Sequence, residues 1–115
     1  MNKGEIKLDE IKNALIEGAE LIIDEHGFLT VWLRLNYGDS GQGFGGFILT
    51  KNGVYSKSGD VAGHFIYRVL EIAGVSDWKD VIGKTIRAKA SHRSVSAIGH
   101  IINDDWFNPT EDFGE

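Results

Sequence analysis

The chain has 115 residues, of which 42% are hydrophobic and 25% are charged, as expected for one globular domain spanning residues 1–115. It contains no cysteine, which excludes disulfides, thiolate metal sites and cysteine nucleophiles. The formal net charge is −5, and all 12 lysine and arginine residues lie within residues 1–102. We therefore expect a neutral body and an acidic C-terminal tail from about residue 104, whose acids are Asp104, Asp105, Glu111, Asp112 and Glu115.

Two strands joined by a turn are predicted at the start of the chain. Residues Ile11–Ile23 carry some apolar residues at helical spacing, but Gly18 and the run Leu21-Ile22-Ile23 favour a strand. Residues Phe28–Tyr37 alternate between apolar and polar side chains, which is the pattern of a strand with one buried face. A hairpin through residues 24–27 would join the two.

The segment Tyr37–Gly46 holds five glycines. Glycine loses much conformational freedom on folding, so this density indicates a backbone shape that other residues would not adopt. We expect a tight or bulged connection into a third strand, Phe44–Thr50, with direct ligand contact as the alternative. Residues Gly41–Gly46 spell G-x-G-x-x-G, but a dinucleotide site needs a helix after this motif. A strand is predicted there, and we reject the match.

One helix is predicted over Val61–Ala73, with Asp60 as its N-cap and Gly74 as its left-handed stop. A second short turn, Asp77–Ile82, is predicted with Ser76 as its cap. The remaining strands are Lys84–Ala90 and Val95–Asn103, and Asn108-Pro109 is expected to end regular structure. The element order βββαββ predicts an α+β fold, in which an antiparallel sheet of about five strands packs on one main α-helix.

Trp32 is the first candidate for a binding residue. Strict alternation places it with Thr30 and Arg34 on the polar side of its strand. A large aromatic residue there either receives cover from the helix or the tail, or anchors an interface. The tail supplies Asp104, Asp105 and Trp106. We expect the tail aromatics to pack on the sheet and the acids to be solvated, where they would mimic nucleic-acid phosphates toward a basic groove.

A second set of residues would suit a phosphate-bearing ligand. The backbone amides of the glycine segment can form a concavity for anions, and basic side chains on the helix and on a later strand could converge there. A solvated helix face is the alternative explanation of those side chains. The set consists of Gly41, Gln42, Gly43, Gly45, His64, Arg68, Lys84 and Arg87.

No catalytic or metal-binding constellation is predicted. The chain has four histidines, and no pair has the i, i+4 spacing of a helical metal site. Ser40 is the one serine in the glycine segment, and we interpret it as a turn residue rather than a nucleophile. We expect no metal, no cofactor and no enzymatic activity.

Four stretches, residues 24–30, 37–46, 65–71 and 98–107, are similar in motif and order to a group of small, mostly uncharacterised proteins encoded by tailed phages and prophages. The glycine segment, with its pattern YG-x-x-GQGFGG, is the most specific part, and the resemblance covers about residues 11–109. It implies a phage or prophage setting in a bacterial cytoplasm, and it implies no activity.

Together these features predict a non-enzymatic binding protein, for which a phage setting suggests a counter-defence inhibitor that binds a host protein such as a CRISPR effector or a nuclease. The alternative is a binder that sequesters a phosphate-bearing nucleotide. Direct nucleic-acid binding is less favoured, because the body is neutral and the tail is acidic. No membrane partner is expected, since no apolar run approaches ~20 residues. An edge strand such as Ile11–Ile23 would allow a homodimer.

Overall fold

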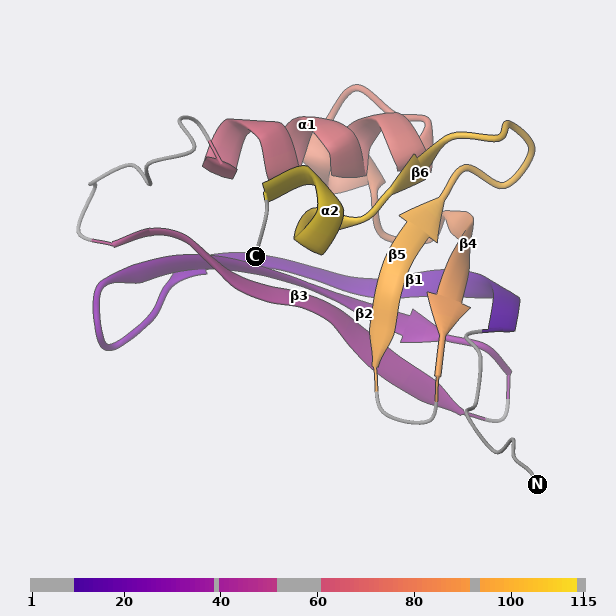
Figure 1. Ribbon diagram of the computed structural model, residues 1–115, viewed down its shortest axis with the longest axis horizontal. Coiled ribbons are helices and arrows are strands. Elements are labelled where there is room, and N and C mark those ends of the chain that lie inside the picture. The colour runs from indigo at the N-terminus through magenta and orange to yellow at the C-terminus, as the bar shows by residue number, and fades with distance from the viewer. Residues whose placement is uncertain (1–9, 39, 52–60, 92–93, 114–115) are drawn as a thin grey trace.

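The computed structural model describes residues 10–38, 40–51, 61–91 and 94–113 (Figure 1). Six strands form one antiparallel sheet in the order β3-β2-β1-β4-β5-β6. This is the predicted α+β fold with one main helix and with one strand more than expected. The elements are β1 (Glu10–Ile23), β2 (Phe28–Asn36), β3 (Gly41–Lys51), α1 (Val61–Ala73), the 3-10 helix η1 (Trp78–Asp80), β4 (Thr85–Ala90), β5 (Val95–Gly99), β6 (Trp106–Phe107) and α2 (Pro109–Phe113).

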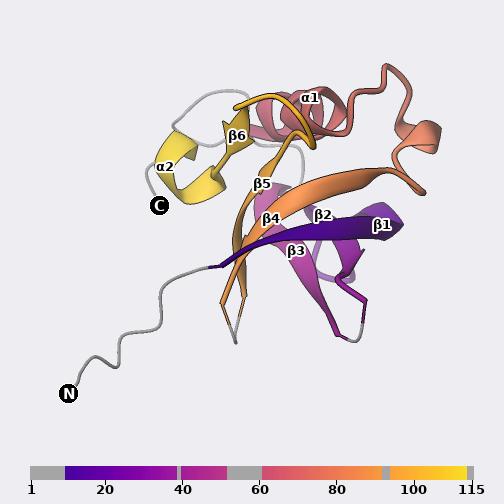
Figure 2. The same ribbon diagram turned by 90° about the vertical axis from the view of Figure 1, so that its right-hand side faces the viewer.

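The sheet is strongly curled because the two halves of the long strand β1 pair with different strands. Its first half pairs with β4 up to Leu15, and its second half pairs with β2 from Leu15 onward. A bulge at Glu17, within the half that pairs with β2, adds twist. The curl brings β3 into contact with β5, and Gln42 Nε2 donates a hydrogen bond of 2.8 Å to the carbonyl of Ser91 across this seam. The strands therefore form a partly closed barrel, and both helices lie on the same side of it (Figures 1 and 2).

The core lies between the inner face of the curled sheet and α1. Alternate residues of β2, such as Leu33, are fully buried, as is Phe65 of the helix. The rings of Phe44, Phe65 and Phe107 pack with centroids 5.1–6.2 Å apart. The predicted bounds of the main helix are confirmed. Neither helix in the described ranges has the length and apolar character needed to span a bilayer.

The ends of α1 were also predicted. Gly74 has the left-handed φ of +74°, and its N–H and that of Val75 both donate to the carbonyl of Leu70, which closes the helix as expected. Asp60, the predicted N-cap, lies outside the described residues. The predicted cap Ser76 is wrong. The Asp77 carboxylate instead accepts the hydrogen bond of the Lys79 N–H and so caps η1.

The C-terminal part differs from the prediction. The last long strand ends at Gly99 rather than at Asn103, because the chain turns there and returns as β6. Asn108-Pro109 starts a helix instead of ending regular structure. The Asn108 side chain accepts the N–H of Glu111 at 3.1 Å, and proline suits the first helical position because its missing N–H has no partner there anyway.

The glycine segment is mostly strand rather than loop. The turn after β2 is short and is closed by a hydrogen bond of 2.8 Å from the Tyr37 N–H to the Ser40 carbonyl. Pairing with β2 resumes at Gly41, three residues before the predicted start of the third strand. The strand continues past Gly46, so rejecting the dinucleotide motif is confirmed.

Candidate functional site

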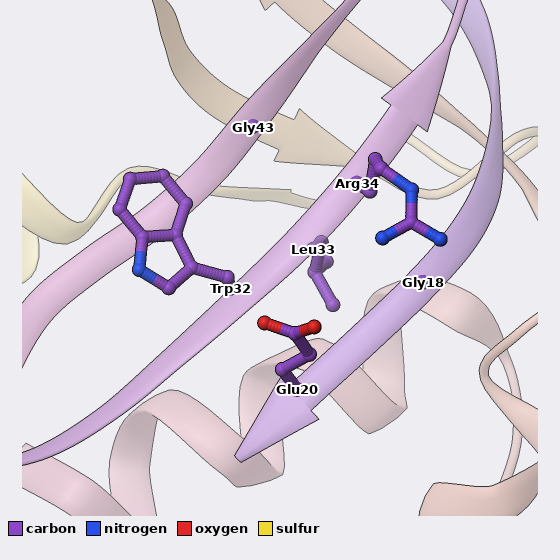
Figure 3. Close-up of a pocket in the computed structure, with 6 residues that line it drawn as sticks. All are labelled: Gly18, Glu20, Trp32, Leu33, Arg34 and Gly43. Carbon is purple, nitrogen blue, oxygen red and sulfur yellow. The ribbon is translucent and has the colours of Figure 1, made fainter. Parts of the chain in front are cut away.

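Trp32 lies on the outer face of the sheet, the face that is turned away from α1 (Figure 3). Its indole lies flat across β3. A Cβ atom added to Gly43 would be 2.9 Å from the ring, and one added to Gly46 would be 2.2 Å from it. The indole therefore rests on bare backbone with one ring face, and the side chain stays 45% exposed. This contact accounts for part of the glycine density, since a side chain at either position would displace the ring.

Arg34 follows Trp32 on the same face of β2 and leans the opposite way, toward β1 (Figure 3). Its guanidinium lies over Gly18, where an added Cβ would be 2.7–2.9 Å from the guanidinium atoms. Its Nη2 donates to the carbonyl of Glu17 at 3.3 Å. Arg34 has no carboxylate partner within the described part of the chain. Arg34 was not predicted as a site residue, although its position two residues after Trp32 places it on the same face of the strand.

Three hollows meet at Gly43 on this face. One lies between Trp32 and Arg34 and has a volume of about 370 Å³. A second, of about 430 Å³, extends along the start of β3 toward Ser40, and a third, of about 510 Å³, extends over the seam to Ser96 at β5. Gly41, Gly43 and Gly45 line these hollows, so bare backbone of β3 forms the floor of the groove.

Trp106 lies on the same outer face as Trp32. Register places Trp106 opposite Gly99, Gly99 opposite Arg87, and Arg87 opposite Asn13 of β1. The Trp106 indole covers Gly99, where an added Cβ would be 2.6 Å from the ring. The Arg87 guanidinium and the Lys89 ammonium are 4.9 and 4.7 Å from the ring centroid. The expectation that the tail aromatics pack on the sheet is confirmed, and Phe107 is fully buried on the inner face.

The tail acids are only partly solvated. Asp104 is exposed, as expected. Asp105 accepts a hydrogen bond of 2.7 Å from Arg68 of α1 while its side chain stays 44% exposed, so it is solvated only in part. Arg68 also pairs with Glu71 and donates to the Trp106 carbonyl at 3.1 Å. Burial lowers the pKa of Arg68, but the hydrogen bonds that its guanidinium donates to Asp105 and Glu71 outweigh burial, and the pKa is raised.

The set predicted for a phosphate-bearing ligand is not gathered into one site. Gly41, Gln42, Gly43 and Gly45 belong to β3, in register with β2, and Gln42 also bonds across the seam. His64 and Arg68 stand on α1 on the other side of the sheet, where His64 pairs with Asp112 at 2.8 Å. The remaining two residues belong to the β4 region, where Lys84 is exposed and Arg87 donates to the carbonyls of His100 and Asn103.

No protein-family model matches this chain, and no solved structure does. A biosynthetic arginine decarboxylase of Pelobacter propionicus (strain DSM 2379 / NBRC 103807 / OttBd1) is 33% identical over 115 residues. The match covers 93% of this chain and only 17% of that enzyme. The chain thus spans a small part of the curated protein it resembles, and the similarity assigns it no reaction.

Proposed function

We propose that this chain is a non-enzymatic binding protein of the phage type, and that the outer sheet face around Trp32 is its binding surface. The observation that carries the proposal is that the Trp32 ring is supported by the sheet on one face and is still exposed to solvent. Its lower ring face is held on Gly43 and Gly46, while the side chain remains 45% exposed next to three hollows. A rigid aromatic side chain that is already ordered loses little entropy when a partner covers it.

The neighbours of Trp32 support this reading. Tryptophan and arginine are the residue types most enriched among residues that dominate binding energy, and Arg34 adjoins Trp32 on this face. Two aliphatic side chains of β1, Ile11 and Leu15, are 58% and 40% exposed on the same face. Together they extend the surface from β3 to β4.

The proposed role is counter-defence, in which the protein blocks a CRISPR effector or a host nuclease in the bacterial cytoplasm. This part rests on the similarity to small phage and prophage proteins. The predicted contact residues divide in the structure: Trp32 and Trp106 lie on the outer face, whereas Asp105 pairs with Arg68. We therefore assign the effector contact to Trp32 and its neighbours rather than to the acidic tail.

The test measures DNA cleavage by purified effectors and nucleases from candidate bacterial hosts, with and without the protein. Wild type is expected to slow cleavage by at least one of them, and Trp32→Ala is expected to weaken inhibition at least about tenfold. Tyr67→Ala is the matched control, because Tyr67 is an aromatic residue of α1 that is 65% exposed on the other side of the molecule. Equal inhibition by wild type and Trp32→Ala would contradict the assignment.

A further inference from the structure

We infer that the Trp32–Arg34 surface recognises unpaired nucleobases, so that what it contacts in an effector assembly is single-stranded nucleic acid. The inference rests on the proposed function for the location of the binding surface and names the ligand that this surface takes. Four observations carry it: two flat side chains, unpaired cations, acceptors for base edges, and the shape of the groove.

The first observation is the pair of flat side chains on β2. The indole of Trp32 lies on Gly43 and Gly46, and the guanidinium of Arg34 lies on Gly18, so backbone supports each plane from below. Aromatic rings and arginine planes are the side-chain groups on which unpaired bases stack. Glycine beneath each one keeps the plane parallel to the sheet and leaves its other face open for a base.

The second observation is the distribution of charge. In the described ranges, the cations of the outer face, Arg34, Arg87 and Lys89, form no ion pair with a carboxylate. The basic residues that do form such pairs lie elsewhere, for example Arg68 on α1 and Lys79 in η1. The net negative charge of the chain therefore does not describe this face, which can attract phosphate groups.

The third observation is that two carboxylates lie beside the stacking planes. Glu20 of β1 is in register with Trp32 and lines the hollow next to it (Figure 3). Glu17 accepts a hydrogen bond of 2.8 Å from the Asn36 amide. Carboxylates repel phosphates but accept hydrogen bonds from the amino groups of bases, such as N4 of cytosine. This arrangement places the base edges toward Glu20 of β1.

The fourth observation is the shape of the groove. The hollows that meet at Gly43 run along the bare backbone of β3 and over the seam to β5. An extended strand fits such a shallow channel and exposes the ring faces of its bases to Trp32. In a duplex those faces are stacked and hidden, so a duplex cannot use the two planes.

The test is fluorescence anisotropy with a fluorescein-labelled single-stranded DNA of about 12 nucleotides and mixed sequence, a length within the range that such grooves hold. Wild type is expected to bind it, to bind the matched duplex at least about tenfold more weakly, and to lose affinity as salt increases. Trp32→Ala is expected to weaken binding at least about fivefold, which is the scale of losing one stacked base.

Three further variants keep the test decisive if Trp32→Ala disturbs folding. Arg34→Gln is expected to weaken binding because it removes one of the two stacking planes, and to reduce the slope of affinity against salt because it removes a cation from the surface. Lys79→Gln removes a cation that is already paired with Asp77 and Asp80, so it should leave both quantities unchanged. Glu20→Gln should reduce any preference for cytosine over thymine, because the carboxylate is the proposed acceptor for the base amino group.

The outcomes separate the two proposals. Inhibition of an effector that depends on Trp32, without measurable binding of the single strand, would overturn this inference and leave the proposed function in place, with the effector's protein surface as the contact. Equal affinity for single strand and duplex, or affinity that Trp32→Ala and Arg34→Gln both leave unchanged, would also overturn it. Absence of both inhibition and strand binding would remove the two proposals together.

Discussion

Trp32 and Trp106 sit on the same face of one sheet, and each indole lies over glycine. They differ in what surrounds the ring. Trp106 covers Gly99, has the Arg87 and Lys89 cations within 4.9 Å of its centroid, and is partly buried. Trp32 rests on Gly43 and Gly46 and is 45% exposed.

The difference shows that a tryptophan lying over a glycine can either stabilise the sheet or form a binding surface. A glycine beneath a tryptophan fixes the ring against the sheet, as aromatic residues do when they cover glycines of neighbouring strands. Where cations also contact the ring and leave it partly buried, the result is stability. Where the outer face of the ring is left uncovered, the result is a preformed contact surface. The comparison makes separate predictions for the two tryptophans.

The largest expected effect separates the two side chains by stability. Trp106→Ala should lower the free energy of unfolding by about 2–3 kcal/mol, because it removes a partly buried ring that covers Gly99. Trp32→Ala should cost about 1 kcal/mol, since much of that ring already contacts water. Urea unfolding followed by circular dichroism measures both values. Equal losses would mean that Trp32 is a structural residue, which would weaken its assignment to binding.

The next effect tests the glycines beneath the rings. Gly99→Ala should cost about 1–3 kcal/mol, because the added methyl group meets a partly buried indole that also contacts the Arg87 and Lys89 cations. Gly43→Ala should cost less than about 1 kcal/mol, because Trp32 can move outward into solvent. Thermal unfolding of the two variants gives the comparison. A larger loss for Gly43→Ala would show that the Trp32 ring is held from both sides.

The smallest effect concerns Tyr37, a ring just after β2 whose buried hydroxyl has no hydrogen-bond partner in the described chain. Burial raises the pKa of Tyr37 above its usual value of 10.0. A raised folded-state pKa means that the stability this group contributes is complete below pH 10.0 and is lost as the pH rises through the folded-state value. Tyr37→Phe should therefore flatten the alkaline decline in unfolding free energy. An unchanged decline would show that the hydroxyl is solvated.

Much of the fold was predictable because single residues carried strong local signals. Alternation defined β2, and helical spacing with Gly74 at the stop defined α1 to the residue. The ambiguous first segment proved to be β1, and its bulge at Glu17 reverses which residues face the core. No periodic pattern reveals such a reversal in advance. The short β6 and α2 were missed, although Asn108-Pro109 carries the signature of a helix start.

The site was less predictable than the fold because it depends on pairs of residues that are distant in the sequence. Trp32 was selected correctly as an outward-facing aromatic residue. Its support by Gly43 and Gly46, and that of Arg34 by Gly18, follow from strand register, which the sequence does not specify. The pairing of Asp105 with Arg68 joins residues 37 positions apart and was likewise invisible in the sequence.

The environment of each indole N–H gives the most direct test of the difference between the two tryptophans. The chain has three tryptophans, so a ¹H–¹⁵N spectrum contains three indole signals, which Trp→Phe variants assign. On addition of the single-stranded DNA, we expect the Trp32 signal to shift or broaden more than those of Trp78 and Trp106. A shift of the Trp106 signal with an unchanged Trp32 signal would contradict this expectation.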